Sequence, residues 1–317
     1  MVVMGSWRSL AVGAQFAALA AAWGSSFLFI KVGLQGVSPA QVVVGRLGVG
    51  ALTLACVLVF GGRRTVPPMR VWGHMTVVAL MLCVAPFLLF GYAEQHVSSG
   101  LASIYNATTP LMTMAVAMLA LTDERPNARR LAGMAIGLLG VLVVLGPWRG
   151  LGGGSAMAQL ACLAATACYG VGFVWLRRFI SPYGLPALTI AAMQVGIGAV
   201  IALILTALLP AHPIEATPSV VGSIAALGAL GTGLAYVWNT NVINAWGATT
   251  ASTVTYLTPV VGVTLGVVIL SERLTWNQPI GAVLVVVGII VTRTAGATKA
   301  SDRPSAMSAA HSSSAPK

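Results

Sequence analysis

Charged residues are the scarcest feature of this sequence. Only 7% of its 317 residues are charged, with 6 acidic residues in all, whereas 57% are hydrophobic. A water-soluble domain carries about 25% charged residues. This shortage and the mean hydropathy of +0.91 exclude a soluble enzyme. The apolar runs are too long for the alternating strands of a membrane barrel. The sequence therefore predicts a polytopic helical membrane protein.

Residues for metal, redox or nucleotide chemistry are also sparse. The 4 cysteines lie in apolar runs without metal or disulfide spacing, and the 4 histidines lie near the ends of such runs or in the C-terminal tail. The sequence contains no HExxH motif and no Gly-Lys-Ser/Thr phosphate loop. We therefore predict no enzyme activity, no catalytic residue, no metal and no cofactor. Proton antiport is disfavoured because no acid is predicted at mid-membrane depth.

Positive charge is in excess, with a formal net charge of +11. Most of the 17 Lys and Arg residues fall on the inner side if the N-terminus is cytoplasmic, for example Arg63, Arg64 and Arg70. This asymmetry follows the positive-inside rule. The excess therefore describes topology and not nucleic-acid binding. It predicts an integral protein of the cell (inner) membrane with both termini in the cytoplasm.

Ten apolar runs are long enough to cross a bilayer as helices. The predicted spans are residues 10–32, 40–60, 74–95, 98–121, 130–147, 156–177, 184–209, 219–242, 249–270 and 277–294. The Gly-rich residues 148–155 predict a flexible linker between a first half (1–147) and a second half (156–294). Residues 295–317 predict a disordered cytoplasmic tail.

The two halves repeat the same landmarks. Thr109-Pro110 corresponds to Thr258-Pro259 at an offset of 149 residues, and Glu124-Arg125 corresponds to Glu272-Arg273 at an offset of 148. Each half has five predicted spans, an odd number, so the second half enters the membrane from the opposite side. The predicted fold class is an all-α membrane protein with ten transmembrane helices in two inverted five-helix repeats.

A set of short landmarks follows in order along the two halves. They are Trp23-Gly24-Ser25-Ser26-Phe27, Lys31, Pro39, Arg46, Pro110, Glu124 and Gly133, followed by Pro259, Glu272 and Gly281. With these landmarks the chain resembles the EamA-type carriers of the drug/metabolite transporter superfamily, from about residue 10 to residue 293. The resemblance implies a ten-helix bundle with a central pathway, usually for export of amino acids or other small metabolites. It does not fix a substrate.

Aromatic and amide side chains near the middle of the spans are candidates for a substrate pocket. Small-molecule sites combine apolar walls with a few polar groups. The predicted substrate-binding residues are Trp23, Tyr105, Asn106, Tyr169, Gln194, Tyr236, Asn239 and Tyr256. Core packing is the alternative for any one of them. As a set, at least three are expected to face a cavity.

Pro110 and Pro259 are predicted near the centres of the fourth and ninth spans. Proline removes a backbone donor and kinks a helix, and the freed carbonyl needs a partner in the protein or in a cavity. The symmetric placement favours a pair of hinges or half-helix ends that face the substrate path. The alternative is a static packing kink.

Lys31, Arg46 and Glu94 are charged residues predicted at or within the outer ends of spans. An unpaired charge at such depth is costly, so we predict that the three form one outer cluster. The cluster would attract a substrate carboxylate or form an outer gate. In the alternative, Lys31 extends to the interface and an Arg46–Glu94 ion pair locks the fold.

Two further features predict helix contacts. Glu124 and Glu272 precede the fifth and tenth spans, where an acid is expected to cap the helix that follows. The GxxxG segments 133–137 and 262–266 permit close helix packing, either within the monomer or in a homodimer.

The predicted function is membrane transport of a small amphipathic solute, most simply export of amino acids by alternating access. The alternatives are an importer or antiporter of another solute, such as a nucleobase, nucleotide sugar, vitamin or drug. A membrane enzyme for lipid-linked substrates would need a polar catalytic cluster that the sequence lacks. A non-transporting scaffold would need an effector domain. The expected partners are the small-molecule substrate and the lipid bilayer.

Overall fold

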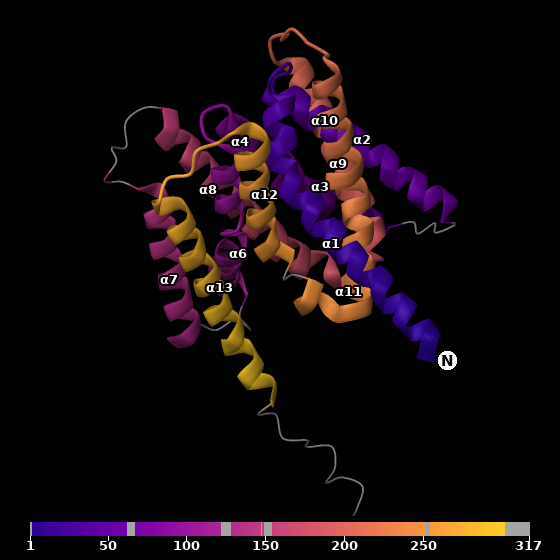
Figure 1. Cartoon of the computed structure of the whole chain (residues 1–317). Coiled ribbons are helices and arrows are strands. Elements are labelled where there is room, and N and C mark those ends of the chain that lie inside the picture. Colours follow the sequence, from indigo (N-terminus) through magenta and orange to yellow (C-terminus); the bar gives the residue numbers. More distant parts are fainter. Residues whose placement is uncertain are drawn as a thin grey trace, which may run out of the picture.

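The computed structural model describes residues 2–61, 67–121, 128–146, 148, 154–251 and 254–301, and this part of the chain contains helices and no strand. Figure 1 shows the helices gathered in one bundle. The first half comprises α1 (Val2–Gly33), α2 (Pro39–Phe60), α3 (Met69–Ala79), η1 (Leu80–Val84), α4 (Ala85–Glu94), α5 (Ser99–Asn106), α6 (Thr109–Ala120) and α7 (Ala128–Leu145). The second half comprises α8 (Gly154–Phe179), η3 (Ser181–Tyr183), α9 (Ala187–Leu208), α10 (Pro218–Gly228), η4 (Ala229–Leu234), α11 (Ala235–Ala251), α12 (Val254–Leu270) and α13 (Asn277–Ser301).

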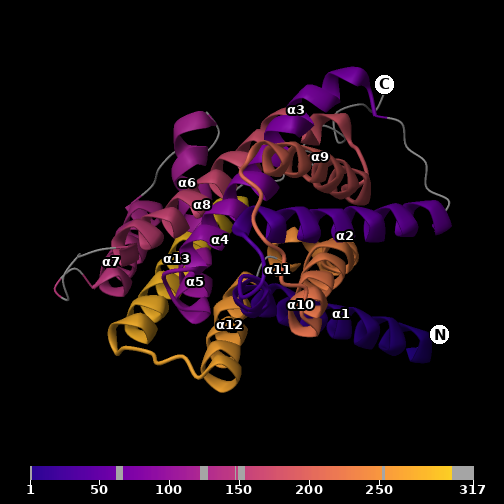
Figure 2. The same ribbon diagram turned by 90° about the horizontal axis from the view of Figure 1, so that it is seen from above.

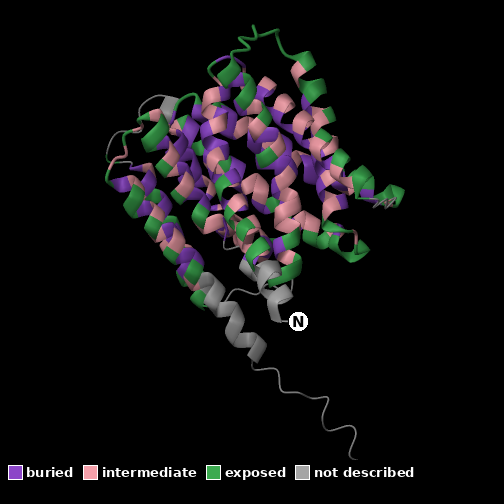
Figure 3. Ribbon diagram, turned by 45° about the vertical axis from the view of Figure 1, so that its right-hand side comes forward, coloured by how far each residue is buried: buried purple, intermediate pink, exposed green. Residues whose placement is uncertain are grey.

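Six helical segments of the described chain are long and apolar enough to cross a membrane. They are Leu10–Gly33, Pro39–Phe60, Met69–Glu94, Ala156–Tyr183, Ala187–Leu208 and Pro218–Trp246. Buried residues lie at the centre of the bundle and exposed ones on its outer faces (Figure 3). Large apolar side chains such as Leu119, Leu208 and Val268 are exposed there. An apolar outer face is expected of a protein that contacts lipid on its sides.

Side-chain caps define where several helices begin. Ser38 accepts a hydrogen bond from the backbone nitrogen of Gln41, and the Gln41 side chain accepts one from the backbone nitrogen of Ser38. This capping box, with Pro39 in the first turn, starts α2. Ser98 and Thr217 start α5 and α10 with single caps.

Two long helical segments contain a π-helical turn in the middle. The turn η1 joins α3 to α4, and η4 joins α10 to α11 without a break in the helix. The turns start at residues 80 and 229, which are 149 residues apart, the same offset as the two Thr-Pro pairs. A π turn widens the helix locally and is often found at functional sites.

The segment predicted as a single span over 98–121 consists of two helices, α5 and α6, which meet beside Pro110. A turn at Ala107 and Thr108 separates α5 from α6, and Pro110 lies in the first turn of α6. Proline at 110 cannot donate to the carbonyl of Asn106. The Thr109 hydroxyl donates to that carbonyl instead, at 2.7 Å.

Pro259 does not interrupt its helix, because α12 continues through it from Val254 to Leu270. The Thr258 hydroxyl donates to the carbonyl of Val254 at 3.3 Å. The two prolines, predicted as a symmetric pair of kinks, therefore differ in this structure. Only the first coincides with a break between helices.

Glycines bring α7 and α13 into backbone contact, and the two helices lie side by side in Figures 1 and 2. A Cβ atom on Gly288 would lie 2.5 Å from the nitrogen of Gly137. A Cβ atom on Gly140 would lie 2.8 Å from the carbonyl oxygen of Gly281. The segment 133–137 therefore packs within the monomer. The homodimer stays a prediction.

The linker and tail boundaries stay predictions. Gly154 and Ser155, predicted as linker, belong to α8, and residues 149–153 lie outside the described residues. The helix α13 runs from Asn277 to Ser301, so it includes the first residues of the predicted tail. Glu124 and residues 302–317 also lie outside the described residues.

Candidate functional site

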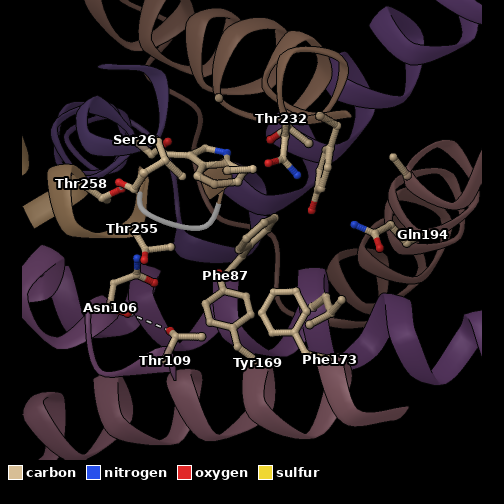
Figure 4. Close-up of a pocket in the computed structure, with 18 of the residues that line it drawn as sticks. Ser26, Phe87, Asn106, Thr109, Tyr169, Phe173, Gln194, Thr232, Thr255 and Thr258 are labelled. Carbon is tan, nitrogen blue, oxygen red and sulfur yellow. Dashed lines mark hydrogen bonds between the residues drawn. The ribbon is translucent and has the colours of Figure 1, made fainter. Parts of the chain in front are cut away.

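A cavity of about 470 Å³ lies among helices of both halves. Its walls are mainly apolar and aromatic, with a minority of hydroxyl and amide groups. The polar members of the lining are Ser26, Asn106, Thr109, Gln194, Thr232, Asn239, Thr240, Thr255 and Thr258. Figure 4 shows the side chains of Asn106, Thr255 and Thr258 gathered on one side of the cavity, with Gln194 on the opposite side. Apolar walls with a few placed polar groups are typical of small-molecule sites.

Six of the eight predicted pocket residues line this cavity. They are Trp23, Asn106, Tyr169, Gln194, Tyr236 and Asn239. They come from both halves, on α1, α5, α8, α9 and α11. Their role in substrate binding stays a prediction, but the structure brings them to one shared space.

Tyr105 and Tyr256 do not line the cavity. Tyr105 is buried in the core, and its hydroxyl donates to Gln159 at 2.7 Å. Tyr256 packs against the same buried cluster. Successive residues of a helix point about 100° apart. Because Asn106 and Thr255 face the cavity, the tyrosines beside them face elsewhere.

Several hydroxyl and phenylalanine side chains of the lining were not predicted from the sequence, including Ser26, Thr232, Thr255, Phe87 and Phe173. Ser26 lies in the Trp-Gly-Ser-Ser-Phe motif, so it could have been found from that motif. Thr232 could not, because it lies in the π turn η4, and no short pattern predicts such a turn.

Arg46 lies in the cavity wall and is 8% exposed. Its Nε donates to the hydroxyl of Thr232 at 2.9 Å. Its guanidinium carbon lies 3.7 Å from the centre of the Phe87 ring, the geometry of a cation–π contact. The predicted ion pair of Arg46 with Glu94 is wrong for this structure. The Arg46 guanidinium contacts Thr232 and Phe87 instead, and within the described residues no salt bridge joins Arg46 to Glu94.

Lys31 contacts the backbone carbonyl of Glu94 and not its carboxylate. The ammonium group donates to the carbonyl oxygens of Glu94 and Val97, the latter at 2.9 Å. These carbonyls lie at and just beyond the C-terminal end of α4, where backbone oxygens lack helical partners. The Glu94 carboxylate is fully buried, and neither of its oxygens has a hydrogen-bond partner among the described residues. The predicted cluster of three charges is therefore not formed by ion pairs.

Glu272 caps a helix other than the predicted one. Its two carboxylate oxygens accept hydrogen bonds from the backbone nitrogens of Ser99 and Gly100, at the start of α5. The helix α13 begins further on, at Asn277, whose side chain donates to the carbonyls of Val143 and Val144. Each polar side chain reaches a neighbouring helix end across the bundle.

The cavity reaches one end of the bundle. Its lining includes Leu176 near the end of α8, Ala187 at the start of α9, and Val254 at the start of α12. Toward the opposite end, the rings of Phe27 and Phe90 meet edge to face with centroids 5.5 Å apart. They belong to a buried cluster that continues to residues 97–101. Phe27 and Phe90, together with Ile30, also line the cavity and bound it toward that end.

The sequence matches the model of the EamA-like transporter family twice, over residues 11–146 and 156–294. The chain belongs to the EamA-like transporter family. The two matches correspond to the two halves, and the cavity of this EamA-like transporter is lined from both. The family and the apolar helices together make it a membrane transporter.

Named relatives cover most of the chain. The uncharacterized inner membrane transporter YedA of Escherichia coli K12 is 27% identical over 289 residues, which are 88% of this chain and 89% of that protein. The uncharacterized transporter YoaV of Bacillus subtilis is 25% identical over 85% of this chain and 92% of its own length. A protein of Salmonella typhimurium named probable amino-acid metabolite efflux pump is 26% identical over 85% of this chain and 90% of its own.

A solved structure shares the fold. A crystal structure that matches 90% of this chain and 99% of its own chain has a TM-score of 0.63 at 22% sequence identity. At this identity the likeness concerns the fold alone. Within the described part of this EamA-like transporter, no three His, Cys, Asp or Glu side chains form a group that could hold a metal ion.

Proposed function

We propose that the protein exports small amphipathic metabolites, such as amino acids, from the cytoplasm by alternating access around the cavity. The main support for this proposal is the cavity, whose wall combines Trp23, Tyr169 and Tyr236 with amides and hydroxyls from both halves. An aromatic wall would hold an apolar side chain, and the polar groups would orient the rest of the solute. A relative named probable amino-acid metabolite efflux pump supports the amino-acid class.

The proposed architecture is ten transmembrane helices in two inverted repeats. The contacts between helices support it, because each contact has a counterpart with the roles of the two halves reversed. The helix α1 packs on α12, and its counterpart α8 packs on α6. Likewise, α2 packs on η4, and its counterpart α9 packs on η1. The matched π turns of α3–α4 and α10–α11 add support. Rocking of two such halves about a central site is a common basis of alternating access.

The proposed direction depends on which side the cavity reaches. Arg177 and Arg178 end α8 at that end of the bundle, and His74 of α3 stacks on Phe179 there, with Arg70 one turn earlier. The positive-inside rule places a cluster of arginines in the cytoplasm. Both termini would then be cytoplasmic, and the cavity would load solute from the cytoplasm.

The test is release of labelled amino acids and dipeptides from preloaded, export-deficient cells with and without the protein. We expect faster release of a few compounds, and Trp23→Ala is expected to lower it at least about tenfold by removing buried aromatic contact. Trp72→Ala is the matched control, because Trp72 is exposed and outside the cavity lining. Unchanged release in Trp23→Ala, with the protein confirmed in the membrane, contradicts the proposed site.

Uptake and exchange are the competing modes of transport. Purified protein in liposomes separates them: an exporter moves solute down its gradient without a counter-solute, whereas a strict antiporter needs one on the opposite side. Flux that depends entirely on a counter-solute would favour the antiporter, and net uptake by whole cells would favour the importer.

A further inference from the structure

Arg46 is the one charged side chain among the described residues that line the cavity. It lies on α2, seven residues after the helix starts at Pro39, and is 8% exposed. No acidic side chain lines the described wall, and no salt bridge to Arg46 occurs within the described residues. The cavity therefore carries a net positive charge that the protein around it does not neutralise by contact.

The surroundings of Arg46 hold its guanidinium in place from two sides. The Thr232 hydroxyl accepts a hydrogen bond from the Arg46 Nε–H. The same hydroxyl donates to the carbonyl oxygen of Leu227 at 3.2 Å. Phe87 packs against the guanidinium at 3.7 Å. These contacts come from η4 and α4, so two helical segments hold the side chain that α2 carries.

The contacts leave most of the donors of Arg46 available. A guanidinium has five N–H donors, and the described protein takes one, the Nε–H. The two terminal nitrogens carry the other four in the planar fork that matches a carboxylate. A buried guanidinium whose terminal N–H groups lack acceptors costs free energy, and an anionic group bound at these nitrogens removes that cost. If Arg46 served only to hold helices together, a carboxylate of the protein would be expected next to its terminal nitrogens.

We propose that Arg46 binds the carboxylate of the transported solute, and that the solute class is an amphipathic organic anion whose amino group is not required. This inference rests on the proposed function and names the chemistry of its site. A cationic solute finds no counter-charge on the described wall. A neutral solute leaves the arginine unpaired.

Matched solutes test the charge requirement in the unaltered protein. Proteoliposomes are loaded with the N-acetyl derivatives of alanine, leucine and phenylalanine, which keep the carboxylate and lose the ammonium group. Parallel liposomes hold the amides of the same amino acids, which keep the ammonium group and lose the carboxylate. We expect protein-dependent efflux of at least one N-acetyl compound at least about tenfold faster than of its amide, the ratio for one charged hydrogen bond.

Variants of Arg46 test whether this residue makes the selection. Arg46→Gln is expected to lower the ratio of N-acetyl to amide efflux toward one. Arg46→Lys is expected to keep a reduced preference for the N-acetyl compounds, since lysine retains the charge but lacks the planar guanidinium. A merely structural arginine would change total efflux and leave the ratio unaltered. Arg178→Gln is the control, because Arg178 also contacts an aromatic ring and a carbonyl, at Phe179 and Ala120, but lies outside the lining.

The outcomes separate the two proposals. Equal efflux of amides and N-acetyl compounds, or a ratio unaltered in Arg46→Gln, overturns the role of Arg46 and leaves export intact. Absence of efflux for these solutes and for the whole amino-acid panel overturns the proposed function together with this inference. If Arg46→Gln fails to fold, the comparison in the unaltered protein and in Arg46→Lys still decides.

Discussion

The carboxylate of Glu272 accepts a hydrogen bond of 2.6 Å from the backbone nitrogen of Ser99. Its second oxygen accepts one of 2.9 Å from Gly100. A residue that follows α12 thus satisfies the first free N–H groups of α5, where a negative charge also complements the helix dipole. A Cβ atom on Gly266 would collide with the same carboxylate, so the glycine gives it room.

Removal of this cap is expected to destabilise the protein. Glu272→Ala should lower the unfolding free energy by about 1–2 kcal/mol, the range for loss of a helix cap. Thermal unfolding in detergent measures it, with Glu215→Ala as the exposed control. Equal stability of the two variants would show that the contact with α5 contributes nothing.

Neutral substitutions of Lys31 and of Glu94 are expected to change the stability of the protein in different ways. Lys31→Met removes the donor to two carbonyls and should lower the unfolding free energy by about 1–3 kcal/mol. Glu94→Gln removes a buried carboxylate that has no donor among the described residues, so it should leave stability unchanged or raise it. Equal destabilisation by the two variants would instead indicate an ion pair.

The contact between α7 and α13 depends on the absence of side chains. Gly288→Ala places a methyl group against the backbone of Gly137 and should cost about 1–3 kcal/mol of unfolding free energy. Gly196→Ala is the matched control, since nothing lies within 4 Å of its Cβ position. There the change should stabilise α9 by about 0.5–1 kcal/mol through helix propensity alone. A stable Gly288→Ala protein would contradict the close packing.

The break between α5 and α6 provides a test of the hinge hypothesis. Pro110→Ala restores a donor for the carbonyl of Asn106, which lines the cavity, and should favour a continuous helix. We expect it to lower transport by more than Pro259→Ala, because α12 is already continuous through its proline. Transport rates at matched membrane levels measure the difference. Equal effects would favour static kinks.

The sequence could predict the membrane class, the helical segments and much of the cavity wall. Charge scarcity and long apolar runs can be read directly from the sequence, and amide or aromatic residues within such runs are candidates for the few polar groups of a small-molecule site. The face of a helix was harder to predict, as Tyr105 and Asn106 show. A helix that is apolar on all sides gives no periodic signal for the direction of one polar residue.

Contacts between distant segments could not be predicted. Glu272 was assigned to the next helix along the chain because local rules consider only neighbours in sequence. Its true partner lies 173 residues away. Likewise, the pairing of Arg46 with Thr232 depends on the π turn in η4, which arises from the packing of whole helices.

The two π turns also bear on which changes of chain length the protein tolerates. A π turn accommodates one residue more than an α turn of the same helix. Deletion of one residue within η1 would return the segment to regular α-helix, and Phe87 and Phe90 would keep their direction. A deletion elsewhere in α3 would rotate everything beyond it by about 100°. In η4 the extra residue belongs to the turn that contains Thr232, so shortening that turn displaces the partner of Arg46 while the helix itself survives.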